Sequence, residues 1–283
     1  MEVQDNFFVQ KGYFEQSKPK TYHVMNRKNF IFTLCIVFSF FLSSSLFAQK
    51  RDIYELITYH IESADQEAML DAYLENAFIP AAHRHGVSNV GVFKPIASQP
   101  DAGQKVYVFI PFKSLSEFEA FEGKLLKDQK YLSDGDAYIN AAFDNPPYKR
   151  METSIMKAMT EHPKYAPSKL TNSKKDRIYE LRSYEGPTER LYRQKVKMFN
   201  SGEMEIFDRL NCSPVFYAET IAGANMPNLM YMTTHENMDV RNEHWKQFGV
   251  DPKWVEMRDI EEYKNTVSRN DTRLLYPTDY SDL

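Results

Sequence analysis

The chain has 283 residues, of which 42% are hydrophobic, and its 35 Lys and Arg residues face 39 Asp and Glu residues for a formal net charge of -4. This composition is too apolar for a disordered chain and is long enough for one large or two small domains. The acidic balance offers no basic footprint for nucleic acid, and two cysteines, Cys35 and Cys212, cannot build a disulfide framework or a thiolate zinc site.

The first pattern along the chain is typical of a secretory signal peptide. Residues 25–28 (MNRK) form a basic start, residues 30–42 form an apolar stretch, and residues 46–49 (LFAQ) supply a small residue for cleavage. We predict that residues 1–48 are an upstream extension plus the signal, with the true start at Met25 and the cut near Ala48. A membrane-anchoring helix is the alternative, but the apolar stretch is shorter than the roughly 20 residues that span a bilayer. The mature protein is therefore expected to be secreted or periplasmic and free of the membrane.

An internal repeat organises the rest of the chain. Residues 52–59 (DIYELITY) recur, with a few changes, as residues 177–184 (RIYELRSY). Residues 161–175, rich in Pro, Lys and Ser, lack hydrophobic periodicity and are typical of a linker. The sequence thus predicts one repeat at residues 49–160 and a second at residues 176–283.

Both copies carry the same order of predicted elements. In the first copy, alternating and apolar runs predict strands, and helical spacing after capping-box patterns at Ser63 and Ser114 predicts helices. The predicted strands are 52–59, 87–96, 105–112 and 148–159, and the helices are 63–78 and 114–125. In the second copy the strands are 177–184, 214–221, 229–234 and 266–276, and the helices are 187–210, interrupted by Gly202, and 237–248.

This β-α-β-β-α-β order predicts an α+β fold. Each copy corresponds to a ferredoxin-like unit, in which a four-stranded antiparallel sheet carries its helices on one face. The other face of each sheet would expose a large apolar surface to water. Two such sheets in one chain are therefore expected to pack face to face as an α+β barrel with the helices outside.

Several motifs resemble the NIPSNAP family of the dimeric α+β barrel superfamily. They are the paired Ile-Tyr-Glu-Leu strands, residues 78–86 (FIPAAHRHG) and residues 90–93 (VGVF). The resemblance implies the barrel fold but no single reaction, because the superfamily includes cofactor-independent oxygenases, haem-handling enzymes and small isomerases or dehydratases. In the first copy Ile57 stands where the second copy has Arg182. A role for that arginine would therefore apply to the second repeat alone.

The repeated first strand supplies the candidate catalytic residues. Alternation places Glu180, Arg182 and Tyr184 on one face of the second copy. The matching face of the first copy carries Glu55 and Tyr59. A charged pair inside a sheet is costly unless its charges meet each other, a ligand or water. Glu55, Tyr59, Glu180 and Arg182 are thus candidates for acid-base chemistry with Tyr184 as a ligand contact, and a solvated edge strand or a cross-repeat ion pair is the structural alternative.

The histidines supply further candidate ligand contacts. His83 and His85 lie near a predicted helix end, where interaction with the helix dipole is a sufficient alternative explanation. His235 follows a predicted strand, and His244 and Trp245 lie on the next helix. Because haem-handling relatives of the superfamily use such a histidine, the resemblance makes His244 the residue to test for haem. The histidine spacing matches no metal motif, so no metal site and no resident cofactor are predicted.

Two functions remain open at this point. The first is an exported module that binds a small apolar or aromatic ligand or pairs with another subunit as a homo-oligomer. The second is a cofactor-independent oxygenase-like or isomerase-like enzyme that acts on an aromatic substrate. No nucleic-acid partner is expected for either, and Cys212 is interpreted as a partly buried structural thiol.

Overall fold

The computed structural model describes residues 50–283. The predicted start at Met25, the signal peptide and the cut near Ala48 lie outside the described residues. Within the described range, every helix is too short or too polar to cross a bilayer.

The first repeat contains the predicted elements together with two additional short helices. Ser63 and Ser114 begin their helices as predicted, because their hydroxyl oxygens accept hydrogen bonds from the backbone N–H of Gln66 and Glu117, both at 3.2 Å. The strands are β1 (Ile53–His60), β2 (Gly91–Pro95), β3 (Lys105–Phe112) and β4 (Arg150–Ala158). The helices are α2 (Ala64–Tyr73), the π-helical turn η1 (Leu74–Phe78), α3 (Ile79–Arg84), α4 (Leu115–Leu125), α5 (Gln129–Asp134) and α6 (Asp136–Ile139).

The second repeat follows the same plan, down to a π-helical turn in its first helix. Gly202, predicted to interrupt this helix, lies in that turn with a φ of 148° that side chains with a Cβ rarely adopt. The strands are β5 (Ile178–Glu185), β6 (Pro214–Ala222), β7 (Asn228–His235) and β8 (Arg269–Pro277). The helical segments are η2 (Lys174–Asp176), α7 (Glu189–Met198), η3 (Phe199–Glu203), α8 (Met204–Arg209), α9 (Met238–Val250), α10 (Pro252–Asp259) and η4 (Glu261–Tyr263).

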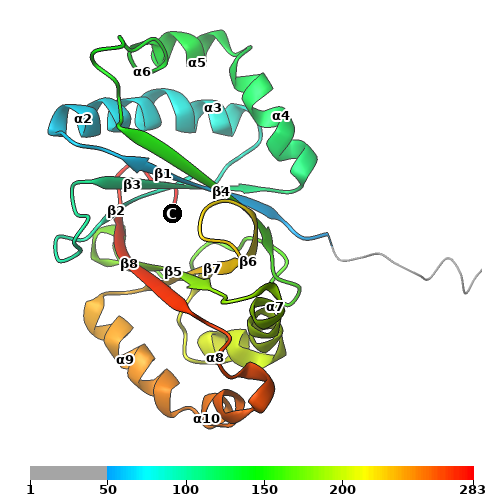
Figure 1. Ribbon diagram of the computed structural model, residues 1–283. Coiled ribbons are helices and arrows are strands. Elements are labelled where there is room, and N and C mark those ends of the chain that lie inside the picture. The colour runs from blue at the N-terminus through cyan, green and yellow to red at the C-terminus, as the bar shows by residue number, and fades with distance from the viewer. Residues whose placement is uncertain (1–49) are drawn as a thin grey trace, which may run out of the picture. The chain divides into compact units, whose positions relative to one another are not determined.

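The eight strands close into one barrel in the order β1-β3-β2-β8-β5-β7-β6-β4. Each repeat contributes four adjacent strands in the ferredoxin-like order, and two antiparallel seams join the repeats, β4 with β6 and β2 with β8. Figure 1 shows the helices of the first repeat on one side of the barrel and those of the second on the opposite side. The predicted α+β barrel with external helices is confirmed.

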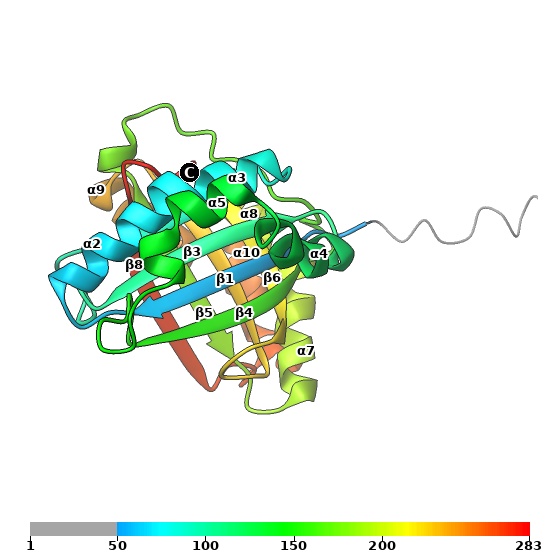
Figure 2. The same ribbon diagram turned by 90° about the horizontal axis from the view of Figure 1, so that it is seen from above.

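Because the sheet is closed, neither first strand lies at an edge. β5 pairs with β7 on one side and with β8 on the other. The interpretation of residues 177–184 as a solvated edge strand is therefore wrong. Figure 2, seen from above, shows α2, α3 and α5 lying over β1 and β3.

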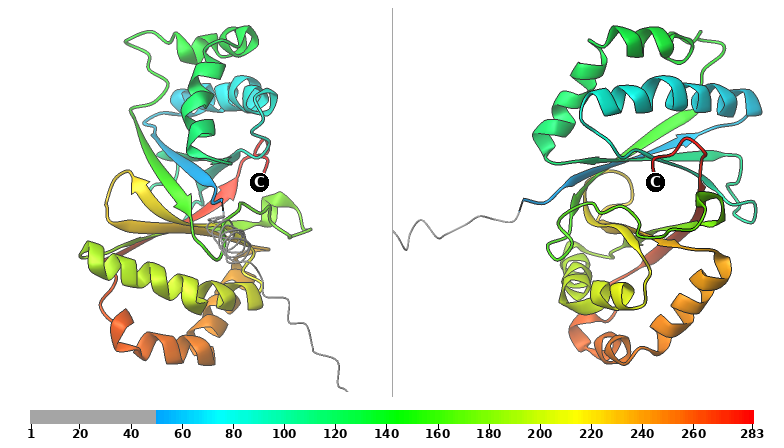
Figure 3. Two further views of the ribbon diagram at one scale, coloured as in Figure 1. Left: turned by 90° about the vertical axis from the view of Figure 1, so that its right-hand side faces the viewer. Right: turned by 180° about the vertical axis from the view of Figure 1, so that it is seen from behind.

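Strand alternation divides the apolar side chains among three cores. One fills the barrel and includes Tyr54 and Tyr179, together with Phe109 and Phe216, whose rings stack at 4.9 Å. The other two lie between the sheet and the helices of each repeat, which the two views of Figure 3 show on opposite sides of the strands. Glu180, next to Tyr179 on β5, consequently points away from the barrel interior and toward the helices.

Candidate functional site

The predicted polar face of β5 lies beneath helix α9. Asn237 begins this helix, since its side-chain oxygen accepts a hydrogen bond from the backbone N–H of Val240. Arg241, His244 and Trp245 then follow at the i, i+3 and i+4 spacing that places side chains on one helical face. Side chains from four segments, β5, the α8–β6 connection, β7 and α9, thereby meet at one place in the second repeat.

Glu180 is the centre of this site and is completely buried. Its carboxylate accepts hydrogen bonds from Arg182 Nε at 2.6 Å and from Trp245 Nε1 at 2.8 Å. Arg241 donates two more, from Nε at 2.7 Å and from Nη2 at 2.9 Å. Both carboxylate oxygens are thus held by charged or ring N–H donors, the strong kind of hydrogen bond.

The surroundings keep Glu180 ionised. Burial alone would raise the pKa of this carboxyl, but the hydrogen bond from Arg241 and the positive charges of Arg182 and Arg241 outweigh it and lower the pKa. A carboxylate so well compensated is a poor proton acceptor and a poor proton donor. Its role at neutral pH is to position the side chains around it.

Arg182 and Tyr184 extend the network along β5. The Arg182 guanidinium lies 3.8 Å from the centre of the Trp245 ring, a cation-π contact, and donates to the Tyr184 hydroxyl at 3.2 Å. The hydroxyls of Tyr184 and Tyr231 are 2.8 Å apart. The Tyr184 hydroxyl therefore hydrogen-bonds to Arg182 and Tyr231 inside the core rather than facing a cavity.

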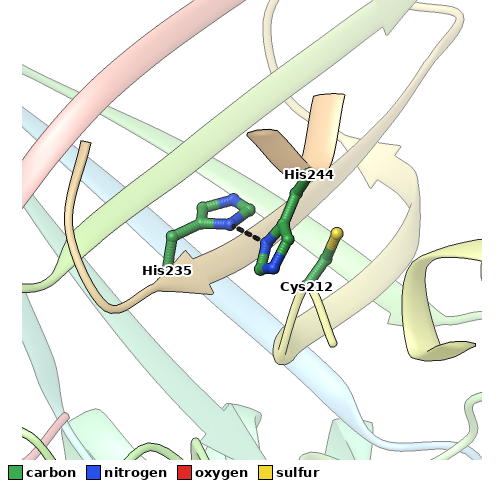
Figure 4. Close-up of side chains that lie close together, drawn as sticks. All are labelled: Cys212, His235 and His244. Carbon is green, nitrogen blue, oxygen red and sulfur yellow. Dashed lines mark hydrogen bonds between the residues drawn. The ribbon is translucent and has the colours of Figure 1, made fainter. Parts of the chain in front are cut away.

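Two histidines and the described cysteine form a second cluster beside Glu180 (Figure 4). The Nδ1 atoms of His235 and His244 are 3.0 Å apart, and one ligand atom each from Cys212, His235 and His244 lies within 4.8 Å of the others. Burial lowers the pKa of His235 to about 4 despite the nearby Glu180 charge, and burial raises the pKa of Cys212 to about 12. At neutral pH the His235 imidazole is therefore neutral and the thiol protonated.

An open pocket of about 660 Å³ lies next to this cluster. The residues that line it come from the linker, the segment from the end of α8 to the start of β6, the β7–α9 connection and α9: His162, Ala166, Pro167, Lys169, Leu170, Asp208, Asn211, Ser213, Pro214, Glu236, Val240 and His244. His244 is the one residue common to the pocket and the cluster. Glu180 and Arg182 do not line the pocket.

The first repeat has no counterpart of this network. Glu55 occupies the position of Glu180, but burial, followed by the charge of Glu122, raises its pKa to about 7. Tyr59 accepts a hydrogen bond from Tyr138 at 3.2 Å and packs within an aromatic group that includes Tyr73 and Tyr148. The cross-repeat ion pair considered for Glu55 and Glu180 is not formed, since the partners of Glu180 all belong to the second repeat.

His83 and His85 lie far from the other candidate residues in the sequence and bind carboxylates of their own. His83 Nε2 is 2.8 Å from Asp282 Oδ2. His85 Nε2 is 3.1 Å from Asp128 Oδ2, which also accepts hydrogen bonds from Arg84. Both histidines thus contact carboxylates around the end of α3.

A second hollow, of about 240 Å³, opens at one end of the barrel. Its lining mixes polar side chains such as Thr58, Ser183 and Asn228 with the charged Lys105 and Arg269. None of the candidate residues predicted from the sequence lies in this lining.

The structure brings together six of the candidate residues predicted from the sequence: Glu180, Arg182, Tyr184, His235, His244 and Trp245. The prediction did not include Arg241 and Cys212, which lie in the same place, or the pocket lining from residues 162–170. Arg241 could have been found from its helical spacing to Trp245. The linker residues carry no periodic pattern and could not.

A family model accounts for most of the described chain. The NIPSNAP model matches twice, at residues 54–161 and at residues 179–282. The chain belongs to the NIPSNAP family. The two NIPSNAP matches coincide with the two repeats, so the family unit is present in tandem. No curated protein matches this NIPSNAP chain.

Solved structures similar to this NIPSNAP protein include two that match about four fifths of its chain. A "putative monooxygenase" from Lactobacillus acidophilus is 12% identical with a TM-score of 0.52, over 80% of this chain and 94% of that one. A "putative monooxygenase" from Fusobacterium nucleatum is 8% identical with a TM-score of 0.53, over 81% and 93%. A NIPSNAP family protein from Agrobacterium tumefaciens is 21% identical with a TM-score of 0.34, over 38% and 98%. At these identities the first two likenesses establish the shared fold.

Proposed function

We propose that this NIPSNAP protein binds a small, partly apolar organic molecule in the pocket beside His244. One observation carries the proposal: a pocket of about 660 Å³ combines apolar side chains with a few converging polar ones. Its volume falls in the range of about 300–1,000 Å³ that is usual for small-molecule sites.

The lining indicates what kind of molecule fits. Leu170, Pro214 and Val240 offer apolar contact, while Ser213 and His244 offer hydrogen bonds. Its charged groups are two carboxylates, Asp208 and Glu236, against the single cation Lys169. A neutral or cationic ligand with an aromatic or aliphatic body and a hydroxyl or amine group matches this lining better than an anion.

Binding of 2-naphthol, a neutral aromatic alcohol, tests the proposal. Its fluorescence is followed on titration of the full chain and of Val240→Trp, which fills part of the pocket. We expect saturable binding at one site by the wild type and an affinity at least about tenfold lower in the variant. In the blocked pocket the naphthol ring can no longer be buried, and this burial stabilises the complex by more than about 1.4 kcal/mol.

The matched control is Leu115→Trp, which adds the same side chain at an exposed position of α4. It should bind 2-naphthol like the wild type. Absence of saturable binding, or equal binding by Val240→Trp and the wild type, would overturn the proposal. Mass spectrometry of protein purified from its own host then identifies the retained molecule.

Haem fits this pocket poorly. Its two propionates would meet Asp208 and Glu236, with Lys169 as the single compensating cation among the lining residues. We therefore derive no role for haem, and addition of haemin should leave its Soret band unshifted.

A cofactor-independent oxygenase-like or isomerase-like enzyme is the second candidate. Glu55 favours it, because a carboxyl with a pKa of about 7 is suited to proton transfer at neutral pH. Two solved proteins with the same fold are named "putative monooxygenase". Oxygen uptake with a hydroquinone, present in the wild type and abolished in Glu55→Gln, would support this candidate, and uptake that survives in Glu55→Gln would remove it.

We also propose that the protein is exported. The support is the sequence of residues 25–49, with its basic start, apolar stretch and small residue at position 48. Determination of the N-terminal residue of the protein recovered outside the cytoplasm tests this directly. The expected first residue is Gln49, and a mature chain that retains residues 25–48 contradicts it.

A further inference from the structure

We propose that Cys212, His235 and His244 bind a borderline-soft divalent transition metal ion, with Zn²⁺ as the ion of first choice. The three side chains come from the α8–β6 connection, the end of β7 and the middle of α9. Their ligand atoms lie within 4.8 Å of one another, and Figure 4 shows the three side chains close together, with His244 between His235 and Cys212. This site is distinct from the organic-ligand pocket and shares with it only His244.

The spacing of the two imidazoles suits a shared metal ion. Their Nδ1 atoms are 3.0 Å apart. Two nitrogen donors on a tetrahedral Zn²⁺, each about 2.0–2.1 Å from the ion, are about 3.3 Å apart. Binding of the ion therefore requires the two nitrogens to move apart by a few tenths of an ångström and both rings to turn until their lone pairs meet at the ion, while His244 moves its own ring proton to Nε2.

The other side of the His235 ring is already arranged as in metal sites. A histidine that binds metal through Nδ1 must carry its proton on Nε2 and usually donates it to an oxygen. His235 Nε2 lies 3.2 Å from Thr233 Oγ1 and 3.9 Å from Glu180 Oε2. Thr233 and Glu180 thus act as positioning residues that fix the ring and its tautomer.

The charge balance favours a divalent ion with one thiolate. Cys212 is 3% exposed and His235 is 1% exposed. When the ion binds, Cys212 loses its proton to solvent, and the thiolate with two neutral imidazoles leaves a net charge of +1 at the site. The Glu180 carboxylate next to His235 also pairs with Arg182 and Arg241, so the Cys212 thiolate is the negative charge that offsets the ion. Sulfur and imidazole donors select zinc-like ions over Mg²⁺ and Ca²⁺, which prefer oxygen.

Three protein ligands leave one coordination position for water or another small donor. Zinc sites with an open coordination position usually have three protein ligands, whereas closed structural sites have four. Because His244 also lines the pocket, a donor group of a molecule in the pocket is the natural candidate for that position.

Titration of the full chain with Co²⁺, a coloured substitute for Zn²⁺, tests the site after treatment with a chelator. We expect one equivalent to bind with a thiolate-to-cobalt charge-transfer band, and Zn²⁺ but not Mg²⁺ to abolish the band. Cys212→Ser should lose the band. His244→Ala should weaken binding by more than about 100-fold, and Thr233→Val by about tenfold, as for loss of a neighbouring hydrogen bond to a ligand.

The control is His83→Ala, which removes a surface histidine of the first repeat and should leave the spectrum unchanged. Circular dichroism verifies that each variant is folded, and the half-buried His244 is the replacement that disturbs the core least. Absence of the band in the wild type, or a band that persists in Cys212→Ser, overturns the metal site. Neither result affects 2-naphthol binding, so the two proposals fail separately.

Discussion

At the scale of single residues, Glu55 and Glu180 occupy the same position of the repeat but meet opposite surroundings. Glu180 accepts four hydrogen bonds from Arg182, Arg241 and Trp245, whereas burial and a second carboxylate are the main influences on Glu55. The partner that makes the difference within the strand is Arg182, which is Ile57 in the first repeat. One substitution between the copies thus accompanies two carboxyls with pKa shifts of opposite sign.

Glu180→Gln should lower the free energy of unfolding at pH 7 by about 3 kcal/mol, because loss of one partner from a buried ionic network leaves the other charges uncompensated. Arg182 and Arg241 would retain only a neutral amide, one end of which is itself a donor. Urea denaturation measures the change. A loss below about 0.5 kcal/mol, typical of neutral surface substitutions, would contradict the role given to Glu180.

Glu55→Gln should remove a pH dependence of stability. Burial, then Glu122, raises the pKa of Glu55 from 4.5 to about 7 in the folded protein. Its contribution is therefore fully present below pH 4.5 and is lost as the pH rises through 7. Between pH 5 and pH 8 the free energy of unfolding of the wild type should therefore fall by about 2 kcal/mol more than that of the variant, allowing for solvent screening. Parallel urea stability curves over this range would contradict the assignment.

At the scale of elements, hydrophobic periodicity and capping residues were sufficient to predict the eight strands and the main helices. Ser63, Ser114 and Gly202 act locally, so their effects could be read from neighbouring residues. The site could be predicted only in part. Cys212 joins His235 and His244 because β6, β7 and α9 pack together, and no local spacing encodes that contact. The prediction that no metal site exists depended on the number of cysteines and on the spacing of the histidines in the sequence.

Helix α7 offers a matched pair of ionic contacts. Lys195 pairs with Glu203 at 2.7 Å with side-chain exposures of 7% and 2%, whereas Lys197 pairs with Glu262 at 2.9 Å with exposures of 57% and 40%. Lys195→Met should lower the free energy of unfolding by about 3 kcal/mol, because it leaves the buried Glu203 carboxylate without its partner. Lys197→Met should lower the free energy of unfolding by less than about 1 kcal/mol, as is usual for exposed ion pairs.

The double variant Lys195→Met/Glu203→Leu separates the two causes of that loss. Replacing both charges by apolar side chains removes the stranded carboxylate, so most of the stability should return. Chemical denaturation of the four proteins gives the comparison. Equal losses for the Lys195 and Lys197 variants would mean that burial of the first pair does not matter.

At the scale of the whole molecule, the two repeats complete one sheet and share its interior. The seams β4–β6 and β2–β8 join them, and Phe109 of the first repeat stacks on Phe216 of the second. An oligomer is therefore not needed to cover the sheet edges. The homo-oligomer predicted from the sequence is tested by light scattering, which measures the mass of the protein in solution. The linker connects two halves that the barrel already holds together.

A protease site inserted beside the exposed Lys175 tests this shared interior. After cleavage the two halves should still elute together from a sizing column, with the mass of the uncut chain, because separation would expose the apolar barrel core to water. Phe109→Asp should separate or unfold the cut halves, since a charge in that core meets no partner to compensate its lost hydration. The same substitution in the uncut chain shows how much of the unfolding occurs while the linker still joins the two halves. Halves that part without denaturant when Phe109 is intact would mean that the linker, rather than the shared core, holds the barrel closed.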